Sequence, residues 1–143
     1  MSIEITTDTG RFDRDRLHAW LSGTYWSRGI PREILDRAID NSICFAALRN
    51  DEMVGFARVV TDRATFAWLC DVFVAEDARG TGVGKTLMDA VMAHRELQGL
   101  RNFFLATRDA HGLYQRYGFA PIDPPELCMA IRHRAEDLYR TNT

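Results

Sequence analysis

Residues 79–86, Arg79-Gly80-Thr81-Gly82-Val83-Gly84-Lys85-Thr86, lie between an almost continuously apolar run at residues 65–74 and an amphipathic helical pattern. Backbone N–H groups at the start of a helix have no intrahelical acceptor, and the helix dipole adds partial positive charge there. The glycines allow a pyrophosphate to approach this bare backbone, and Lys85 adds a full positive charge. The stretch therefore predicts a phosphate-binding turn; the other interpretation is a glycine-rich turn that only begins the helix.

Two familiar phosphate loops do not fit this stretch. A Walker A loop would need glycine at the position of Arg79, and the dinucleotide fingerprint would need its third glycine at the position of Lys85. The pattern that does fit is R-x-x-G-x-G, through Arg79, Gly82 and Gly84. It resembles the acetyl-coenzyme A signature of the GNAT superfamily of N-acetyltransferases. The resemblance implies that residues 79–86 hold the pyrophosphate of acetyl-CoA.

Hydrophobic periodicity and turn residues predict the elements along the rest of the chain. Strands are expected at 3–6, 43–48, 54–60, 65–74, 103–106 and 127–131, and helices at 13–21, 31–41, 83–97 and 110–117. This order predicts an α/β (α+β) fold, with a single domain over residues 1–143, a mixed sheet flanked by helices and a polar tail from about residue 133. The order also resembles the GNAT fold, whose sheet is mostly antiparallel, over about residues 3–132.

Composition excludes several classes of partner. With 143 residues, 46% of them hydrophobic, the chain suits one domain with a sizeable core, and a net charge of −2 argues against nucleic acid or an acidic membrane surface as partner. Three widely spaced cysteines suit reduced thiols, so we expect a cytoplasmic protein without a metal site. The first residues do not resemble a signal peptide, and no apolar run is long enough to span a membrane.

A second motif, residues 110–119, resembles the A-x-x-x-Y-x-x-x-G-F pattern of GNAT enzymes. The resemblance implies that Tyr114 lies near the coenzyme sulfur as general acid, a task that suits a phenol; the alternative is an aromatic side chain packed on the sheet. Tyr117 is expected to pack or to lie near the nucleotide end. The family often has Asn seven residues before the tyrosine, and Thr107 stands there, so its hydroxyl would only partly replace the amide contact.

The resemblance also places Phe73 and Val74 beside the pantetheine arm of the coenzyme, although their side chains could simply belong to the core. Asp71 interrupts the same apolar strand, and a buried carboxylate needs either a partner or a task. It could hold the amine of the acceptor or accept its proton, as acidic residues do in some polyamine-acetylating relatives. The alternative is an Asp paired with a buried Arg, such as Arg58 or Arg108.

Two further groups near the predicted site have ordinary alternatives. Cys70 could accept the acyl group, but no histidine adjoins it, and a buried structural thiol is the other interpretation. His111 titrates in a useful range and could assist proton removal, or it could simply face solvent.

Selection of the acceptor is expected from the loop between the first two helices. Tyr25 and Trp26 could form the walls of an amine pocket by apolar and cation–π contact, and Arg28 could select a substrate with a carboxylate. An aromatic pair that only plugs the core is the alternative.

The sequence therefore predicts an N-acetyltransferase that moves acetyl directly from acetyl-CoA to a primary amine, with Tyr114 as general acid and Asp71 aiding the amine. Tyr25 and Trp26 favour a small-molecule acceptor, and the strand edges of a GNAT-like sheet would allow a homodimer. The first alternative is a non-catalytic acyl-CoA-binding or regulatory module that keeps the glycine turn without turnover. A nucleotide-hydrolysing P-loop protein is the second, and Arg79 argues against it.

Overall fold

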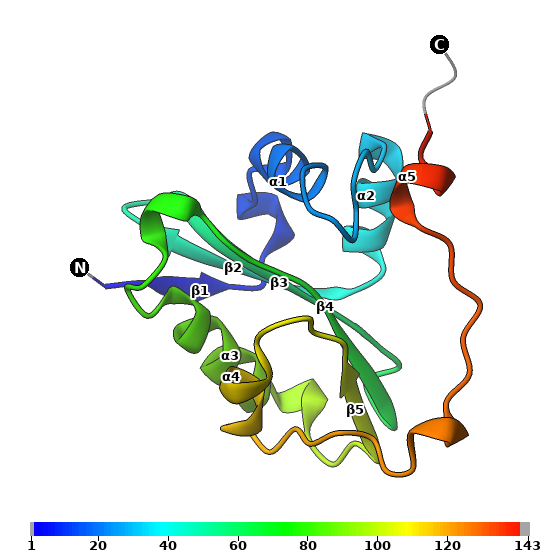
Figure 1. The fold of residues 1–143 in the computed structure, drawn as a ribbon. Coiled ribbons are helices and arrows are strands. Elements are labelled where there is room, and N and C mark those ends of the chain that lie inside the picture. Colours follow the sequence, from blue (N-terminus) through cyan, green and yellow to red (C-terminus); the bar gives the residue numbers. More distant parts are fainter. Residues whose placement is uncertain (1, 141–143) are drawn as a thin grey trace.

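A five-stranded sheet with helices on both faces makes up the computed structural model, which describes residues 2–140 (Figure 1). The strands are β1 (Glu4–Thr6), β2 (Ile43–Arg49), β3 (Glu52–Thr61), β4 (Phe66–Val74) and β5 (Asn102–Leu105), paired in that order. The helices are α1 (Arg14–Leu21), α2 (Arg32–Asp40), α3 (Val83–Ala93), α4 (His111–Gln115) and α5 (Ala135–Leu138). Neighbouring strands are antiparallel except β4 and β5, which are parallel. The predicted mixed, mostly antiparallel sheet is confirmed.

Two apolar clusters cover the two faces of the sheet. Figure 1 shows α1 and α2 on one face and α3 and α4 on the other. Strand β2 serves both, because Phe45 and Ala47 pack in the cluster of α3 while Cys44 and Ala46 pack in the cluster of α1 and α2. Successive side chains of a strand point to opposite faces. Burial on both faces therefore explains why the central strands read as continuous apolar runs.

Gly55 in β3 allows the start of α3 to pack directly on the sheet. A Cβ atom at this position would lie 2.8 Å from Cγ1 of Val83 and 3.0 Å from Cδ1 of Leu87. The first distance is shorter than real Cβ contacts and the second is at their lower limit, so a Cβ atom here would force Val83 and Leu87 to shift. The glycine thus places the first turn of α3 beside the end of β4.

Strand β4 carries a bulge in its second half. Arg58 pairs with Cys70 and Phe56 pairs with Phe73, so one residue of β3 faces two residues of β4, Asp71 and Val72. Asp71 has a φ of 49°, in the left-handed region that Asp tolerates better than most residues. Pairing between β4 and β5 ends at Leu69 and Leu105, whereas β4 continues to Val74. The two parallel strands therefore part just where the bulge begins.

Helices α3 and α4 are shorter than the periodicity predicts. Helix α3 ends at Ala93 and is followed by a separate 3-10 turn, Arg95–Leu97, because His94 takes an extended conformation between them. Helix α4 is limited to five residues. No helix within residues 2–140 is both long and apolar enough to cross a membrane.

The strand predicted at residues 127–131 is wrong. This segment forms no strand pairing in the described part of the chain, and Leu127, Met129 and Ile131 are 76%, 95% and 93% exposed. Alternating apolar residues form a strand only when another strand edge supplies hydrogen bonds, and none does so here. Within the polar tail, Ala135 of α5 is buried and Tyr139 packs on the α1–α2 cluster.

Candidate active site

The turn at residues 79–86 is open and offers unused backbone donors. Gly82, at the N-terminal end of α3, has φ 88° and ψ 7°, and no side chain caps the helix there. The N–H groups of Val83, Gly84 and Lys85 have no hydrogen-bond acceptor among the described residues. A Cβ atom at Gly80 or Gly82 would meet nothing within 4 Å. Free donors at a helix start, beside open space, are what a pyrophosphate needs.

Arg79 attaches this turn to the end of β4. Its Nε donates to the carbonyl oxygen of Val74 at 3.0 Å, and its guanidinium lies 5.5 Å from the ring centre of Phe73. Phe73 in turn stacks on Trp20 of α1 at 5.0 Å. Arg79 therefore holds the turn against the end of β4. Phe73 packs against Trp20 and also lines a neighbouring hollow.

That hollow, which we call the Trp20 hollow, has a volume of about 620 Å³ and runs along β4 from the turn. It is lined by Ala19, Trp20, Gly23, Thr24, Tyr25, Trp26, Val72, Phe73, Val74 and Arg79. The predicted positions Phe73 and Val74 thus lie on a path that begins at the glycine turn. Tyr25, Trp26 and Val72 also line the next cavity, so the path continues past the bulge.

Side chains on the outer flank of α3 are already bonded to one another. Lys85 Nζ lies 3.1 Å from Asp89 Oδ2, and the hydroxyl of Tyr117 donates to Asp89 Oδ1 at 2.9 Å. The Lys85 side chain is 69% exposed, and the hydroxyl of Thr86 donates to the Gly82 carbonyl at 2.9 Å. Thr81 likewise donates to the carbonyl of Ala78. Tyr117 therefore lies beside the first turns of α3, and direct contact of these side chains with a cofactor stays a prediction.

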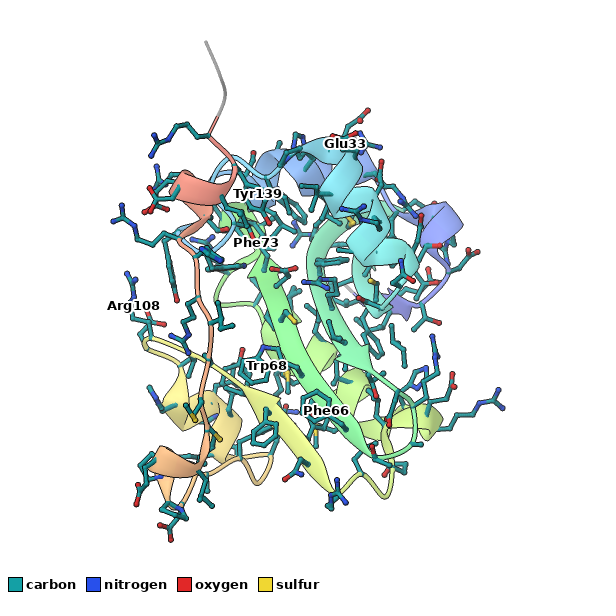
Figure 2. The ribbon with its side chains drawn as sticks, turned by 90° about the vertical axis from the view of Figure 1, so that its right-hand side faces the viewer. Glu33, Phe66, Trp68, Phe73, Arg108 and Tyr139 are labelled. Atoms are coloured by element: carbon teal, nitrogen blue, oxygen red, sulfur yellow. The ribbon has the colours of Figure 1, made fainter. Side chains whose placement is uncertain are left out.

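A cleft of about 730 Å³ lies where β4 and β5 part. It is lined by Tyr25, Trp26, Trp68, Leu69, Cys70, Asp71, Val72, Leu105, Ala106, Thr107, Arg108, Asp109, Ala110, Tyr114 and Arg132. Figure 2 shows Trp68 and Arg108 on this side of the molecule, together with the C-terminal segment that contributes Arg132. The cleft brings together five of the predicted site residues: Tyr25, Trp26, Asp71, Thr107 and Tyr114.

Tyr114 is 92% buried in α4 and lines the cleft. Its ring packs edge-on against Phe119, with 6.1 Å between ring centres, so the packing alternative describes the ring correctly. Burial, together with the nearby charge of Asp109, raises the pKa of the phenol above its ordinary value. The hydroxyl makes no hydrogen bond within residues 2–140. Tyr114 therefore keeps its proton at neutral pH and is free to donate it.

Both carboxylate oxygens of Asp71 are engaged. Oδ2 accepts from Arg58 Nε at 2.7 Å, and Oδ1 accepts from Trp26 Nε1 at 2.7 Å. The Asp71 side chain is 7% exposed and that of Arg58 is 17% exposed. The structure thus shows Asp71 paired with the buried Arg58, which was the alternative to a carboxylate that contacts the acceptor amine. Contact of Asp71 with the acceptor amine stays a prediction.

The environment of Cys70, beside Asp71, is that of a structural thiol. Its thiol donates to the carbonyl oxygen of Trp68 at 3.5 Å, and burial raises its pKa above the ordinary value. A thiol that holds its proton is a poor nucleophile at neutral pH. The geometry therefore favours the structural interpretation of Cys70.

The loop between α1 and α2 supplies an aromatic corner of the cleft. Tyr25 and Trp26 meet edge to face at 5.0 Å and are 47% and 40% exposed, so they do not plug the core. The guanidinium of Arg108 lies 3.8 Å from the ring centre of Tyr25. Arg28, by contrast, is exposed and is not among the residues that line the cleft.

Thr107 lines the cleft, whereas His111 is exposed and lies outside it. The Oγ1 atom of Thr107 accepts from the backbone N–H of Ala110 at 3.0 Å, so this hydroxyl fixes the turn into α4. Thr107 still lines the cleft, and its contact with a cofactor stays a prediction. His111 lines a separate groove along β5, and it is not among the cleft residues.

Sequence reasoning missed three contributors to the cleft: Trp68, Arg132 and the backbone at the bulge. Trp68 lies within an apolar run, where nothing distinguishes a cleft residue from a core residue. Arg132 directly follows residues 127–131, which were wrongly predicted to form a strand. The left-handed Asp71 is the signal that could have indicated the bulge, since Asp is one of the few residues that tolerate this conformation.

Comparison with known proteins identifies the family to which this fold belongs. The family model of the acetyltransferase (GNAT) domain matches residues 40–121, which is more than half of the chain. A GNAT-family protein of Xanthomonas campestris pv. campestris has a crystal structure that superposes with a TM-score of 0.95, at 48% identity and 99% coverage of both chains. A structure from Deinococcus radiodurans R1 shares the fold alone, with a TM-score of 0.73, 23% identity and coverage of 99% of this chain and 94% of that one.

Among curated proteins, FG08082 of Gibberella zeae, whose name marks it only provisionally as an acetyltransferase, is 29% identical over 133 residues. The match covers 77% of this chain and 74% of that protein. Members of the GNAT family generally use acetyl-CoA as co-substrate. The chain belongs to the GNAT family of acetyltransferases, and it is an acyltransferase.

Proposed function

We propose that the chain transfers acetyl directly from acetyl-CoA to the primary amine of a small molecule. The observation that carries this proposal is the buried phenol of Tyr114, which makes no hydrogen bond among the described residues and lies in the cleft where β4 and β5 part. Its raised pKa suits a proton donor. The aromatic corner of Tyr25 and Trp26 supports a small acceptor, because it encloses one end of a cavity of limited volume.

The coenzyme would follow the path from the glycine turn to the cleft. The N–H groups of Val83, Gly84 and Lys85 would bind the pyrophosphate, and the Trp20 hollow beside Phe73 and Val74 would take the pantetheine arm. This path ends at the bulge, where a residue of β4 is left without a partner in the ladder. We propose that a backbone N–H at this bulge, of Asp71 or Val72, donates to the thioester carbonyl oxygen.

Acyl transfer on this path needs no covalent enzyme intermediate. The neutral amine attacks the thioester carbon, and the carbonyl oxygen becomes an oxyanion that the N–H donor at the bulge stabilises. The amine nitrogen loses its proton to solvent, and the C–S bond breaks as the intermediate collapses. Tyr114 gives its proton to the departing thiolate of the coenzyme and regains one from solvent.

Charge at the far end of the cleft narrows the class of acceptor. Two guanidinium groups, of Arg108 and Arg132, and one carboxylate, of Asp109, line it. The carboxylate of Asp71 is already satisfied by Arg58 and Trp26, so the cleft lining carries an excess of positive charge. Arginine pairs well with a carboxylate or a phosphate. We therefore propose an acceptor that carries such an acidic group besides its amine.

The test is a thiol-release assay with acetyl-CoA and pairs of amines that differ only in an acidic group, such as an amino acid and its amide. Coenzyme A binding is followed by calorimetry in parallel. Faster release with the acidic member of each pair is the expected result. Release only with lysine peptides would contradict a small acceptor. Binding of coenzyme A without release across a broad amine panel would favour the non-catalytic acyl-CoA-binding module.

A further inference from the structure

Arg58 of β3 is a buried cation on the face of the sheet that α1 and α2 cover. It pairs directly with Cys44 of β2, and Cys44 packs in the α1–α2 cluster, so the side chain of Arg58 points to the same side. Most of this side chain is shielded from solvent. A buried guanidinium is costly unless acceptors satisfy its N–H groups. Its hydrogen bonds are therefore strong and directional, because one partner is charged.

Arg58 lies at the centre of a continuous series of hydrogen bonds, which we call the Arg58 chain. Its Nε donates to Oδ2 of Asp71 at 2.7 Å, and its Nη1 donates to Oγ of Ser42 at 3.1 Å. At one end, the hydroxyl of Ser42 donates to the carbonyl oxygen of Ala38 in α2 at 2.7 Å. At the other end, Oδ1 of Asp71 accepts from Nε1 of Trp26 at 2.7 Å. The Arg58 chain therefore connects the end of α2 with the loop between α1 and α2.

The loop that carries Trp26, residues 22–31, also has bonds of its own. Nε2 of His18, in α1, lies 2.7 Å from the carbonyl oxygen of Ile30. The buried hydroxyl of Thr24 donates to the backbone at the end of α1 at 2.7 Å. The loop is thus a defined unit, and the indole N–H of Trp26 joins this unit to the bulge in β4.

Asp71 links the Arg58 chain to the backbone of the bulge. Asp71 and Val72 together face a single residue of β3, and Asp71 has a left-handed φ of 49°. This conformation is uncommon for a residue with a Cβ atom, and it persists where surrounding contacts fix it. Each carboxylate oxygen of Asp71 is bonded to a separate donor, so the side chain has little freedom. The Arg58 chain therefore restricts the backbone on which Asp71 lies.

We infer that the Arg58 chain positions the N–H donors of the bulge for acetyl transfer. Trp26, Arg58 and Ser42 are its positioning residues, and they act through the carboxylate between them rather than by contact with the reacting atoms. The inference rests on the proposed function, in which an N–H at the bulge donates to the thioester carbonyl oxygen. Bonds to both carboxylate oxygens keep this N–H in place before the acetyl group arrives, as preorganised stabilisation of an oxyanion requires.

The same bonds set the acceptor end relative to the bulge. Trp26 lines the cleft, and its indole N–H holds the carboxylate of Asp71. The aromatic wall beside the amine and the donor beside the thioester are thus held at one fixed spacing. Small errors in such a spacing are costly to the rate, because both reactants must lie in an attacking geometry.

The first test measures polarisation of the thioester and needs no acceptor. Acetyl-CoA labelled with ¹³C at the thioester carbonyl is bound to the protein, and the isotope-edited infrared band of this carbonyl is compared with that of free acetyl-CoA. The native protein should shift the band to lower wavenumber, because an accepted hydrogen bond weakens the C=O bond. Trp26→Phe keeps an aromatic ring and loses the indole N–H, so its shift should be smaller.

Two further variants separate positioning from stability. Ser42→Ala removes a bond at the far end of the Arg58 chain, outside the cleft lining, and should also reduce the shift, though by less than Trp26→Phe. Cys44→Ala is the matched control, because Cys44 is buried opposite Arg58 but makes none of these bonds. It should lower Tm and leave the band unchanged. A native band at the free position, an unchanged band in Trp26→Phe, or equal changes in Ser42→Ala and Cys44→Ala would overturn the inference.

Kinetics distinguish the inference from the proposed function. With the amine that gives the fastest thiol release, Trp26→Phe should lower kcat roughly tenfold and Ser42→Ala roughly two- to threefold, with coenzyme A affinity unchanged in both. Losses in Trp26→Phe and Arg58→Gln should not multiply in the double variant, since both changes act on one carboxylate. Multiplicative losses would contradict a shared chain. A native band shift without thiol release from any amine would contradict the proposed transfer and still support the positioning of the bulge.

Discussion

The turn at residues 79–86 and the acceptor end of the cleft are built in opposite ways. At the turn, backbone N–H groups of Val83, Gly84 and Lys85 have no partner, and the glycines leave open space beside them. At the acceptor end, side chains from distant segments already satisfy one another, as Asp71 does with Arg58 and Trp26. The comparison teaches that a cofactor shared by a family can be held by backbone, whereas an acceptor is selected by side chains that only the fold brings together.

The largest effect is expected from Tyr114→Phe, which removes a proton donor and leaves the backbone of both regions intact. We expect kcat to fall by roughly 10² to 10⁴, the usual contribution of a general acid, with coenzyme A binding unchanged. Steady-state kinetics and calorimetry measure the two quantities. Tyr117→Phe is the matched control, since Tyr117 donates to Asp89 on α3 and should change kcat far less. Equal losses in both variants would contradict the part assigned to Tyr114.

Asp71→Asn tests whether the acceptor end is held together by its internal bonds. Removing one partner of a buried ion pair should lower the free energy of unfolding by about 3 kcal/mol, the low end of the usual range, because the amide oxygen still accepts. Asn also tolerates the left-handed backbone at this position. Chemical denaturation measures the change. Asp89→Asn, at an exposed pair beside the turn, is the control and should be much milder.

Kinetics of the same variants separate two tasks for Asp71. If the carboxylate only holds the bulge, Asp71→Asn and Arg58→Gln should lower kcat to a similar extent. A loss in Asp71→Asn well beyond that of Arg58→Gln would instead indicate that the carboxylate acts on the amine.

Gly82→Ala tests the backbone donors at the turn. Its φ of 88° costs about 1–2 kcal/mol for a residue with a Cβ atom, so relaxation of the turn should weaken coenzyme A binding by roughly tenfold. Gly99→Ala imposes a similar strain, at a φ of 69°, far from the turn. It should lower Tm comparably and leave coenzyme binding unchanged. Equal binding losses in the two variants would mean that the effect is one of general stability.

Alkaline pH should lower the free energy of unfolding through ionisation of Tyr114. The pKa of its phenol is raised in the folded state, so the protonated form is favoured by folding. This contribution is fully present below the unfolded pKa, about 10, and is lost as pH rises through the folded pKa. The difference in unfolding free energy between the native chain and Tyr114→Phe should therefore shrink above about pH 10. A constant difference would contradict the raised pKa.

The smallest effects concern the arginines at the acceptor end. Arg108→Ala removes the contact with Tyr25 and should raise KM for the acceptor by roughly two- to fivefold. Arg28→Ala should leave KM within about twofold, because Arg28 is exposed and lies outside the cleft lining. If Arg28→Ala raised KM more than Arg108→Ala, this would support the contact between Arg28 and the acceptor that the sequence predicts.

Prediction from sequence succeeded where local rules apply. The glycine turn, the helix after it and the core strands follow from spacing and apolar runs, and the sheet, its helices and the family are confirmed. It failed at residues 127–131, which alternate like a strand but lack a partner edge in their own chain. Sequence reasoning could not decide whether Asp71 pairs with an arginine or contacts the amine. Arg58 can be identified as its partner only once the pairing of β3 with β4 is known.

Short-range chemistry thus specified the glycine turn of this protein, because glycines, a following helix and an apolar strand are neighbours in sequence, although Gly55 of β3 decides how closely that helix packs on the sheet. The acceptor end depended on the fold. Tyr25, Asp71, Arg108 and Arg132 come from four separate segments. Their meeting requires a bulge in β4, the parting of β4 from β5 and a C-terminal segment that is anchored on the α1–α2 cluster through Tyr139. Each of these results from packing and strand pairing across the whole sheet, which no local pattern records.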